Sequence, residues 1–283
     1  MKRDGLATRI SVIVAVYNGA ATLRQCIESV TSQTYPNREL IVMDGGSTDG
    51  TAQILEDNAS KLAYWQSAPD RGIYDAWNKG LDHATGDWIC FLGADDYLWN
   101  AAVMEKLEPY LRASHARVVY GRVAVVNKAN EVSRYDGVPW DEARRSFEHT
   151  MTIPHPGLMH HRSLFAEHGK FDDSFRIAGD YDLLLRELRT RPALFVSEII
   201  TVGMRHGGLS NSPSIQGQVL KELARIRKKH GIRAPLLWSS VRFKMTMCAW
   251  TVRWLGERRF RLAADWLRKI TGRPQVWTED AKS

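Results

Sequence analysis

The fold is decided by the stretch Ile10-Ser-Val-Ile-Val-Ala-Val16, which runs into Tyr17-Asn18-Gly19. A run this rich in apolar, β-branched residues predicts a buried strand, and the Asn-Gly pair predicts its end. Apolar residues at Leu23, Ile27 and Val30 then recur with helical spacing, which predicts a helix over residues 22–32. A buried strand followed by a helix is the first step of a βαβ unit with a parallel sheet.

The same alternation continues through residue 100 and predicts an α/β fold with a mainly parallel sheet. The further strands of this part are predicted at 39–43, 63–66 and 87–92, and its further helices at 51–60 and 73–84. Beyond residue 101 the pattern loosens, and we predict helices at 103–111 and from Asp180 to Arg189, strands at 118–127 and 193–202, and a mixed loop and helix segment at 139–156.

Composition excludes several classes of protein. The 283 residues are 44% hydrophobic and 25% charged, which is typical of a globular chain. Three scattered cysteines, Cys26, Cys90 and Cys248, cannot form a disulfide framework or a zinc cluster, so we expect a reducing compartment. No apolar run approaches the roughly 20 residues of a membrane-spanning helix, and the short run at 10–16 is a poor signal peptide.

The net charge of +7 is distributed very unevenly. Residues 1–216 hold 23 Lys and Arg against 27 Asp and Glu, whereas residues 217–283 hold 16 against 5. A slightly acidic body with a strongly basic tail suggests that the tail meets an anionic surface.

Three polar clusters follow predicted strands or begin a helix, and ligands of open α/β sheets bind outside the carboxyl ends of the strands. Asp44-Gly-Gly-Ser-Thr-Asp-Gly50 is suited to a nucleotide or is merely a structural turn. Gly93-Ala94-Asp95-Asp96 offers adjacent carboxylates for a divalent cation on a diphosphate, or a solvated strand end. Asp180 and Asp182 begin a helix, where a general base and a simple helix-dipole effect are both possible.

Together these clusters resemble the family-two glycosyltransferases with the GT-A fold, and the subgroup found in bacterial surface-polysaccharide clusters. The motifs that carry the resemblance are Ser11-Val-Ile-Val-Ala-Val-Tyr-Asn18, Glu39-Leu-Ile-Val-Met-Asp-Gly-Gly-Ser-Thr-Asp-Gly-Thr51, Asp70-Arg-Gly-Ile-Tyr-Asp-Ala-Trp-Asn-Lys-Gly80, Gly86-Asp-Trp-Ile-Cys-Phe-Leu-Gly-Ala-Asp-Asp96 and Asp180-Tyr-Asp-Leu183. The likeness covers roughly residues 9–210 and thins between 110 and 150.

The resemblance implies a nucleotide-sugar site, with a UDP-sugar favoured because a carboxylate can accept the imide N–H of uracil. In such enzymes Asp44 corresponds to the carboxylate that binds the base. The other positions that the resemblance assigns to the nucleotide-sugar are Val16, Tyr17, Asp70, Asn78, Lys79 and Ala94.

The resemblance also implies the reaction. Asp95 matches the last acid of the family's Asp-x-Asp motif and would bind Mn²⁺ or Mg²⁺ on the diphosphate. Asp180 matches the general base that deprotonates the acceptor hydroxyl, and attack opposite the diphosphate would invert the anomeric configuration. Because Gly93 replaces the first acid of the motif, Asp96 and His206 are further candidates for the metal.

Two other positions stay open. Trp77 stands where many relatives carry Arg, so Arg71 or Lys79 is expected to supply the positive charge. His155 is a candidate for lining the acceptor site.

The basic tail predicts amphipathic helices over residues 241–255 and 260–270, each with aromatic and arginine side chains. We expect the tail to contact an anionic membrane. Simple padding of the domain or a homodimer contact is the alternative, and no nucleic-acid motif accompanies the basic residues.

The sequence therefore predicts a GT-A catalytic domain over 1–215, with 1–100 binding the nucleotide-sugar and 101–215 the acceptor, and a basic helical extension over 216–283. The expected reaction moves one sugar at a time to a lipid-linked or polysaccharide acceptor, because the Gln-x-x-Arg-Trp element of processive synthases is missing. The expected place is the cytoplasmic face of a bacterial membrane. A sugar nucleotidyltransferase and an inactive nucleotide-sugar-binding module are the alternatives.

Overall fold

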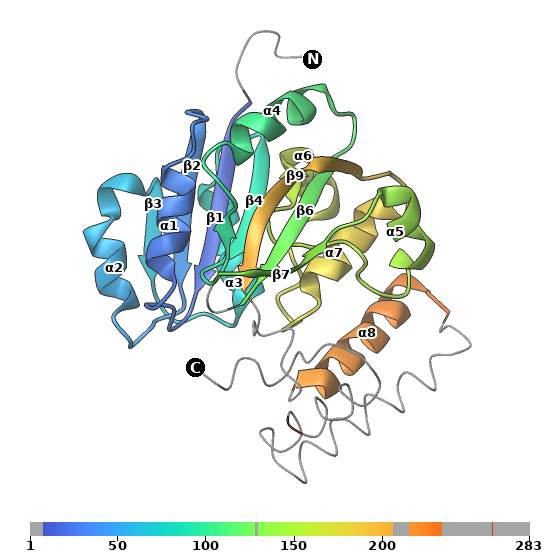
Figure 1. The fold of residues 1–283 in the computed structure, drawn as a ribbon. Coiled ribbons are helices and arrows are strands. Elements are labelled where there is room, and N and C mark those ends of the chain that lie inside the picture. Colours follow the sequence, from blue (N-terminus) through green and yellow to red (C-terminus); the bar gives the residue numbers. More distant parts are fainter. Residues whose placement is uncertain (1–7, 128–129, 206–214, 234–261, 263–283) are drawn as a thin grey trace. The chain divides into compact units, whose positions relative to one another are not determined.

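A computed structural model describes residues 8–127, 130–205, 215–233 and 262 of the chain. Two compact units make up the chain: Met1–Val126 with Val132–Arg205, and Asn127–Glu131 with His206–Ser283. The first unit contains the sheet and the helices α1 to α7, and the second contains the helix α8 (Figure 1).

Four parallel strands form one half of the sheet, in the order β3-β2-β1-β4. Their bounds are β1 (Ile10–Val16), β2 (Arg38–Asp44), β3 (Tyr64–Ser67) and β4 (Trp88–Gly93). Every residue of β1 is buried, as a central strand covered on both faces requires. The predicted parallel strands of residues 1–100 are all present.

The other half of the sheet mixes strand directions. It contains β5 (Tyr97–Leu98), β6 (Val118–Val126), β7 (Val132–Asp136), β8 (Met159–His161) and β9 (Leu194–Arg205). The strands β6 and β9 are parallel, whereas β8 runs antiparallel to both β4 and β6, β7 to β6 and β5 to β9. The α/β fold is as predicted, but β5, β7 and β8 were not predicted, and they make this half mixed.

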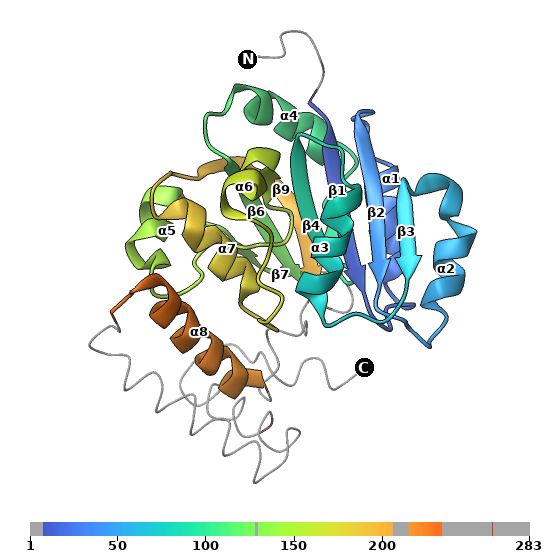
Figure 2. The ribbon, with the colours of Figure 1, turned by 180° about the vertical axis from the view of Figure 1, so that it is seen from behind.

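Helices cover both faces of the sheet. The helices of this unit are α1 (Leu23–Thr31), α2 (Thr51–Asp57), α3 (Ile73–His83), α4 (Val103–Ala113), α5 (Trp140–Phe147), α6 (Arg162–His168) and α7 (Gly179–Leu188). In Figure 1 α1 lies in front of the sheet, and from behind, in Figure 2, α3, α6 and α7 lie in front of it. The strand β1 is therefore enclosed between α1 and α3.

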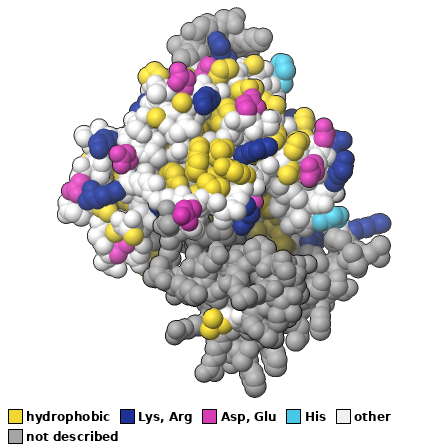
Figure 3. Space-filling model, viewed as in Figure 1, with side chains coloured by type: hydrophobic (Ala, Val, Ile, Leu, Met, Phe, Trp, Pro, Cys, Tyr) yellow, Lys and Arg dark blue, Asp and Glu magenta, His cyan; other side chains and the backbone are white. Residues whose placement is uncertain are grey.

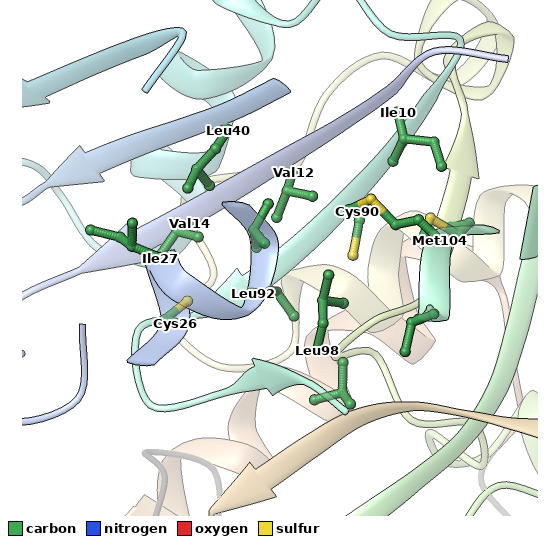
Figure 4. Close-up of a cluster of buried hydrophobic side chains, with 14 of the residues drawn as sticks. Ile10, Val12, Val14, Cys26, Ile27, Leu40, Cys90, Leu92, Leu98 and Met104 are labelled. Atoms are coloured by element: carbon green, nitrogen blue, oxygen red, sulfur yellow. The ribbon is translucent and has the colours of Figure 1, made fainter. Parts of the chain in front are cut away.

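The core on the α1 side is shown in Figure 4, where Val12 and Val14 of β1 lie close to Cys26 and Ile27 of α1. The opposite face of β1 meets α3 so closely that a Cβ on Gly80 would lie 2.4 Å from a methyl carbon of Ile13. Only a glycine allows this approach. Both Cys26 and Cys90 are buried free thiols, as expected for a core without disulfides.

The helix α8 (Gln216–His230) ends with Arg227, Lys228, Lys229 and His230, a basic last turn that the helix dipole favours. The amphipathic helices predicted at 241–255 and 260–270 lie outside the described residues, apart from Leu262. Across the part of the chain that the structure describes, no helix is both long and apolar enough to cross a membrane.

The face of the molecule in Figure 3 carries acidic and basic side chains in a mixture around a central group of hydrophobic ones. No broad area of one charge appears on the described part of this face. In the sequence, the excess of basic residues lies in residues 217–283.

Candidate functional site

Strand register brings the predicted donor-binding positions to one edge of the sheet. Val16, the last residue of β1, pairs with Asp44 of β2, which in turn pairs with Ser67 of β3. On the other side of β1, Ala15 pairs with Gly93 of β4. The carboxyl ends of four neighbouring parallel strands therefore coincide, which is where ligands of such sheets bind.

Next to this edge, Tyr17 exposes 67% of its surface, whereas Val16 and Ala94 are buried. An exposed tyrosine ring directly after a strand end offers a flat apolar surface to a ligand. Val16 and Ala94 lie together against Gly19, where an added Cβ would be 2.5 Å from a methyl carbon of Val16 and 3.3 Å from the Cβ of Ala94.

The carboxylate of Asp44 organises the turn after β2. It is 3% exposed and accepts hydrogen bonds from the backbone N–H of Ser47 at 3.1 Å, the hydroxyl of Ser67 at 2.5 Å and the hydroxyl of Ser47. A carboxylate has about four lone-pair sites, so three donors leave about one for a ligand. Asp44 thus holds the turn after β2, and its carboxylate keeps limited hydrogen-bonding capacity for the base of a nucleotide.

Asp70 lies against the residue that follows Asp44. A Cβ on Gly45 would lie 2.7 Å from Asp70 Oδ2, and Asp70 Oδ1 accepts the backbone N–H of Gly72 at 2.8 Å. The structure therefore brings Asp44 and Asp70 together, and Gly45 provides the space between them.

Asp95 and Asp96 have different environments after β4. Asp95 is half-buried, and its carboxylate lies over Gly93, since a Cβ there would lie 2.6 Å from Asp95 Oδ1. Asp96 is buried, and burial first, then the charge of Asp95, raises its pKa well above the usual range. Arg205 of β9 donates to the carbonyl oxygen of Asp95 at 3.0 Å.

The carboxylate oxygens of Asp95 and Asp96 are of the kind that binds a divalent cation when a diphosphate supplies further oxygen ligands. Mg²⁺ and Mn²⁺ prefer oxygen ligands, and Mg²⁺ is commonly bound by one or two carboxylates together with phosphate oxygens. Among the described residues no group of three or more His, Cys, Asp or Glu side chains converges, and Asp95 and Asp96 are the carboxylates that follow β4. His206 lies outside the described residues.

The start of α3 carries a buried carboxylate between two cations. Lys79 lies 3.0 Å from Asp75 Oδ2 and Arg71 lies 2.9 Å from Asp75 Oδ1. Burial acts to raise the pKa of Asp75, but the hydrogen bonds from Arg71 and Lys79 outweigh it and lower the pKa to about 2. Arg71 also pairs with Asp173, so the two cations proposed to replace the family's arginine are both engaged with carboxylates.

Asn78 makes a structural contact. Its amide N–H donates to the carbonyl oxygen of Phe171 at 2.9 Å, and its amide oxygen accepts the backbone N–H of Phe171 at 3.0 Å. This reciprocal pair fixes α3 to the segment before α7. The structure thus places both polar atoms of the Asn78 amide in hydrogen bonds with Phe171.

Asp180 is half-buried in the first turn of α7 and contacts α3. The hydroxyl of Tyr74 lies 3.1 Å from Asp180 Oδ1, and the backbone N–H of Tyr181 donates to the same oxygen at 2.8 Å. Residues 70–75 therefore touch the Asp44 turn on one side and the candidate base on the other.

The two buried histidines near the site are held neutral. Burial lowers the pKa of His155 to about 3 and lowers that of His160 well below the usual value. His155 packs on Trp77, with ring centroids 5.2 Å apart, and its Nε2 is buried without a hydrogen-bond partner. It lies in an aromatic cluster, which offers little support for contact with an acceptor.

Tyr74 and the serines on Asp44 were not predicted as site residues. Tyr74 is 3% exposed, and a tyrosine in an apolar helix position indicates only core packing. Ser47 reaches Asp44 from the turn after β2 and Ser67 from the end of β3, and nothing in their local sequence marks them as partners.

Residues 11–168 match the family described as Glycosyl transferase family 2. A PGL/p-HBAD biosynthesis glycosyltransferase of Mycobacterium bovis is 31% identical over 263 residues, which cover 89% of this chain and 99% of the relative.

Solved structures show the same fold at lower identity. One is TarS 1–349 of S. aureus in complex with UDP, with a TM-score of 0.61, 20% identity, and 90% of this chain and 75% of that one covered. Another is the mannosyltransferase PcManGT of Pyrobaculum calidifontis in complex with GDP-Man and Mn²⁺, with a TM-score of 0.60, 18% identity, and coverage of 93% and 72%. The fold is thus of the GT-A type. From the family match and the mycobacterial relative together, this chain belongs to glycosyl transferase family 2.

Proposed function

We propose that this glycosyltransferase moves a single sugar from a nucleotide-sugar, a UDP-sugar in the first instance, to a hydroxyl of a lipid-linked or polysaccharide acceptor, with inversion at the anomeric carbon. The observation that carries the proposal is the common edge of Val16, Asp44 and Gly93, joined through residues 70–75 to Asp180. This edge offers a nucleotide turn, carboxylates for a cation and a carboxylate base.

Asp44, with Asp70 beside it, is proposed to accept a hydrogen bond from the base, and Tyr17 to cover the ring. The relatives' bound nucleotides are UDP in one case and GDP-Man in another. Uracil and guanine both carry a ring N–H donor, so Asp44 suits either base. Lys79 is proposed to lie near the diphosphate, while Asn78 contributes by fixing α3.

Asp95, with Asp96 behind it, is proposed to hold Mn²⁺ or Mg²⁺. When bound, the cation neutralises charge on the leaving diphosphate. Asp180 takes the proton of the acceptor hydroxyl while that oxygen bonds to the anomeric carbon. The bond from this carbon to the diphosphate oxygen breaks on the opposite face, and its electron pair leaves with the nucleoside diphosphate.

Product analysis tests the reaction. The chain is incubated with UDP-sugars and GDP-sugars, each with Mn²⁺ or Mg²⁺, and the nucleotide released is identified. We expect UDP from slow donor hydrolysis. Pyrophosphate would instead indicate a nucleotidyltransferase, and the absence of turnover with every donor would indicate a binding module. NMR of the new linkage with an accepted acceptor reports inversion, and product length reports one addition per encounter.

Asp180→Asn tests the base. We expect transfer to fall by about 10²–10⁴-fold, the usual contribution of general base catalysis, with unchanged donor affinity by calorimetry. Asp57→Asn is the control, because Asp57 is an exposed carboxylate that pairs with Arg24 on the helices α1 and α2. Transfer by Asp180→Asn at the wild-type rate would remove Asp180 from this role.

Residues 216–283 are proposed to attach the enzyme to the cytoplasmic face of a bacterial membrane. The support is the net positive charge of this segment and the basic last turn of α8. Sedimentation with vesicles of phosphatidylglycerol and of phosphatidylcholine tests the proposal, and binding only to the former, reduced by salt, is expected. Equal recovery with both vesicles, or a dimer by light scattering without vesicle binding, would assign the segment to another contact.

A further inference from the structure

The hydroxyl of Tyr74 lies between two oxygen atoms of the segment that carries the candidate base. It is 2.6 Å from the carbonyl oxygen of Ile177 and 3.1 Å from Asp180 Oδ1. The ring of Tyr74 is buried and lies against Gly179, where an added Cβ would be 2.9 Å from two ring carbons. The contact between α3 and the start of α7 is therefore built around this one side chain.

A phenol hydroxyl has one hydrogen to donate. The carbonyl of Ile177 can only accept, and an ionised Asp180 can also only accept. The carbonyl is the nearer oxygen, and when the hydrogen points to Ile177 the lone pairs of the phenol face Asp180. A protonated Asp180 can donate to those lone pairs, and every group in the chain of three is then satisfied.

Tyr74 itself stays protonated. Burial first, and then the charge of Asp180, raises the pKa of Tyr74 well above its usual value. The phenol thus acts as a hydrogen-bond partner and does not become a second base.

Several charged groups of the two helices and of the intervening segment form ion pairs with one another. Asp75 pairs with Arg71 and Lys79, and the buried Asp182 of α7 pairs with Arg186. Before α7, Asp173 pairs with Arg71, and a carbon of Arg176 would be 4.0 Å from a Cβ on Gly72.

We propose that Tyr74 is a positioning residue that stabilises Asp180 in the protonated form it reaches when it has taken the acceptor's proton. This rests on the proposed function, in which Asp180 is the base. The proton of the acceptor hydroxyl moves to Asp180, the new carboxyl O–H donates to Tyr74 Oη, and Tyr74 keeps donating to Ile177. The proton leaves to solvent after the product dissociates, so Tyr74 gains and loses none.

Tyr74→Phe tests this, because it keeps the ring contacts with Trp77 and Phe171 and removes only the hydroxyl. We expect kcat to fall about tenfold and the acidic limb of its pH profile to move about one unit lower, the equivalent of one hydrogen bond to the reacting carboxyl. Tyr120→Phe is the matched control, since the Tyr120 hydroxyl also donates to a buried carbonyl, that of Val138, at 2.7 Å.

An unmoved acidic limb, or one that moves to higher pH, would overturn the inference. The pH dependence of Tm gives a second reading without turnover. We expect the gap between wild type and Tyr74→Phe to widen as the pH falls, and to become independent of pH in an Asp180→Asn background. A gap that does not depend on pH in either background would contradict it.

The two proposals can fail separately. If Asp180→Asn transfers sugar at the wild-type rate, the proposed function fails and the present inference fails with it. If Asp180→Asn is inactive but Tyr74→Phe keeps the wild-type pH profile, the base assignment stands and only the role of Tyr74 is lost.

Discussion

The carboxylate of Asp95 occupies the space in which a side chain at Gly93 would begin. A Cβ at position 93 would lie 2.6 Å from Asp95 Oδ1 and 3.5 Å from Asp96 Oδ2. The Asp95 side chain therefore turns back over Gly93, and a side chain at position 93 would collide with it.

Gly93→Ala should consequently weaken metal binding with little effect on folding. The new methyl group must displace the Asp95 carboxylate, and we expect the affinity for Mn²⁺ in the presence of UDP to fall about tenfold, or about 1.4 kcal/mol. Titration followed by electron paramagnetic resonance measures it. Gly217→Ala, which adds a methyl group in open space, is the control. Unchanged Mn²⁺ affinity in Gly93→Ala would exclude Asp95 as the ligand.

Asn78→Ala should affect stability more than donor binding. It removes both hydrogen bonds to Phe171, and we expect the free energy of unfolding to fall by about 2 kcal/mol. Urea denaturation measures this. Asn78→Asp keeps an acceptor for the N–H of Phe171 but sets a carboxylate against its carbonyl oxygen, so it should not restore stability. A stable Asn78→Ala protein with greatly weakened donor binding would indicate instead that Asn78 contacts the diphosphate of the donor.

His155 should make stability depend on pH. Its folded pKa of about 3 lies below the ordinary 6.5, so between these values the unfolded chain binds more protons and stability falls as the pH falls. One such group contributes up to about 1.4 kcal/mol per pH unit. His155→Gln should remove that part of the slope between pH 6 and 5, measured by urea denaturation. His115→Gln, at an exposed position, should leave the slope as it is, and equal slopes in all three proteins would show that His155 is not buried as a neutral ring.

We expect Glu39 to stabilise the end of the sheet that lies opposite to the candidate site. Its carboxylate accepts hydrogen bonds from Ser11 Oγ at 2.5 Å, from the N–H of Thr85 at 2.6 Å and from Arg9 at 3.0 Å. Burial acts to raise the pKa of Glu39, but the hydrogen bonds from Ser11 and Thr85 outweigh it and lower the pKa.

Glu39→Gln should therefore lose about 2 kcal/mol of stability at pH 7, because the donors around the carboxylate lose their charged partner. The contribution of a carboxyl with a lowered pKa is complete above its ordinary value of 4.5 and is lost as the pH falls through the folded pKa. The gap in unfolding free energy from wild type should thus close in acid. Sugar transfer per folded molecule should be unchanged. A gap that grows in acid would contradict the lowered pKa.

The sequence predicted the half of the fold in which each element has a strong local pattern. Three of the four parallel strands, β1, β2 and β4, are buried and largely apolar runs, and Leu23, Ile27 and Val30 of α1 mark one helix face. The strands β5 and β8 have two and three residues, too few for any periodicity, and β7 is mostly exposed. Their pairing depends on partners far along the chain.

The sequence predicted those parts of the candidate site in which an acidic residue directly follows the end of a strand. The positions of Asp44 and Asp95 at one edge follow from the parallel order of β2, β1 and β4. The role of Asn78 was not predictable from the sequence, since its partner Phe171 lies 93 residues away. Tyr74 was hidden for a similar reason, because its hydroxyl meets Asp180 only after α3 and α7 pack.

Five consecutive positions, 70–74, touch both the turn after β2 and the first turn of α7. Because this short bridge is continuous in the chain, we expect changes between residues 110 and 150 to leave its contacts with the turn after β2 and with the start of α7 in place. We expect members of the family that differ in acceptor to differ first in that interval, and to keep the length of the bridge.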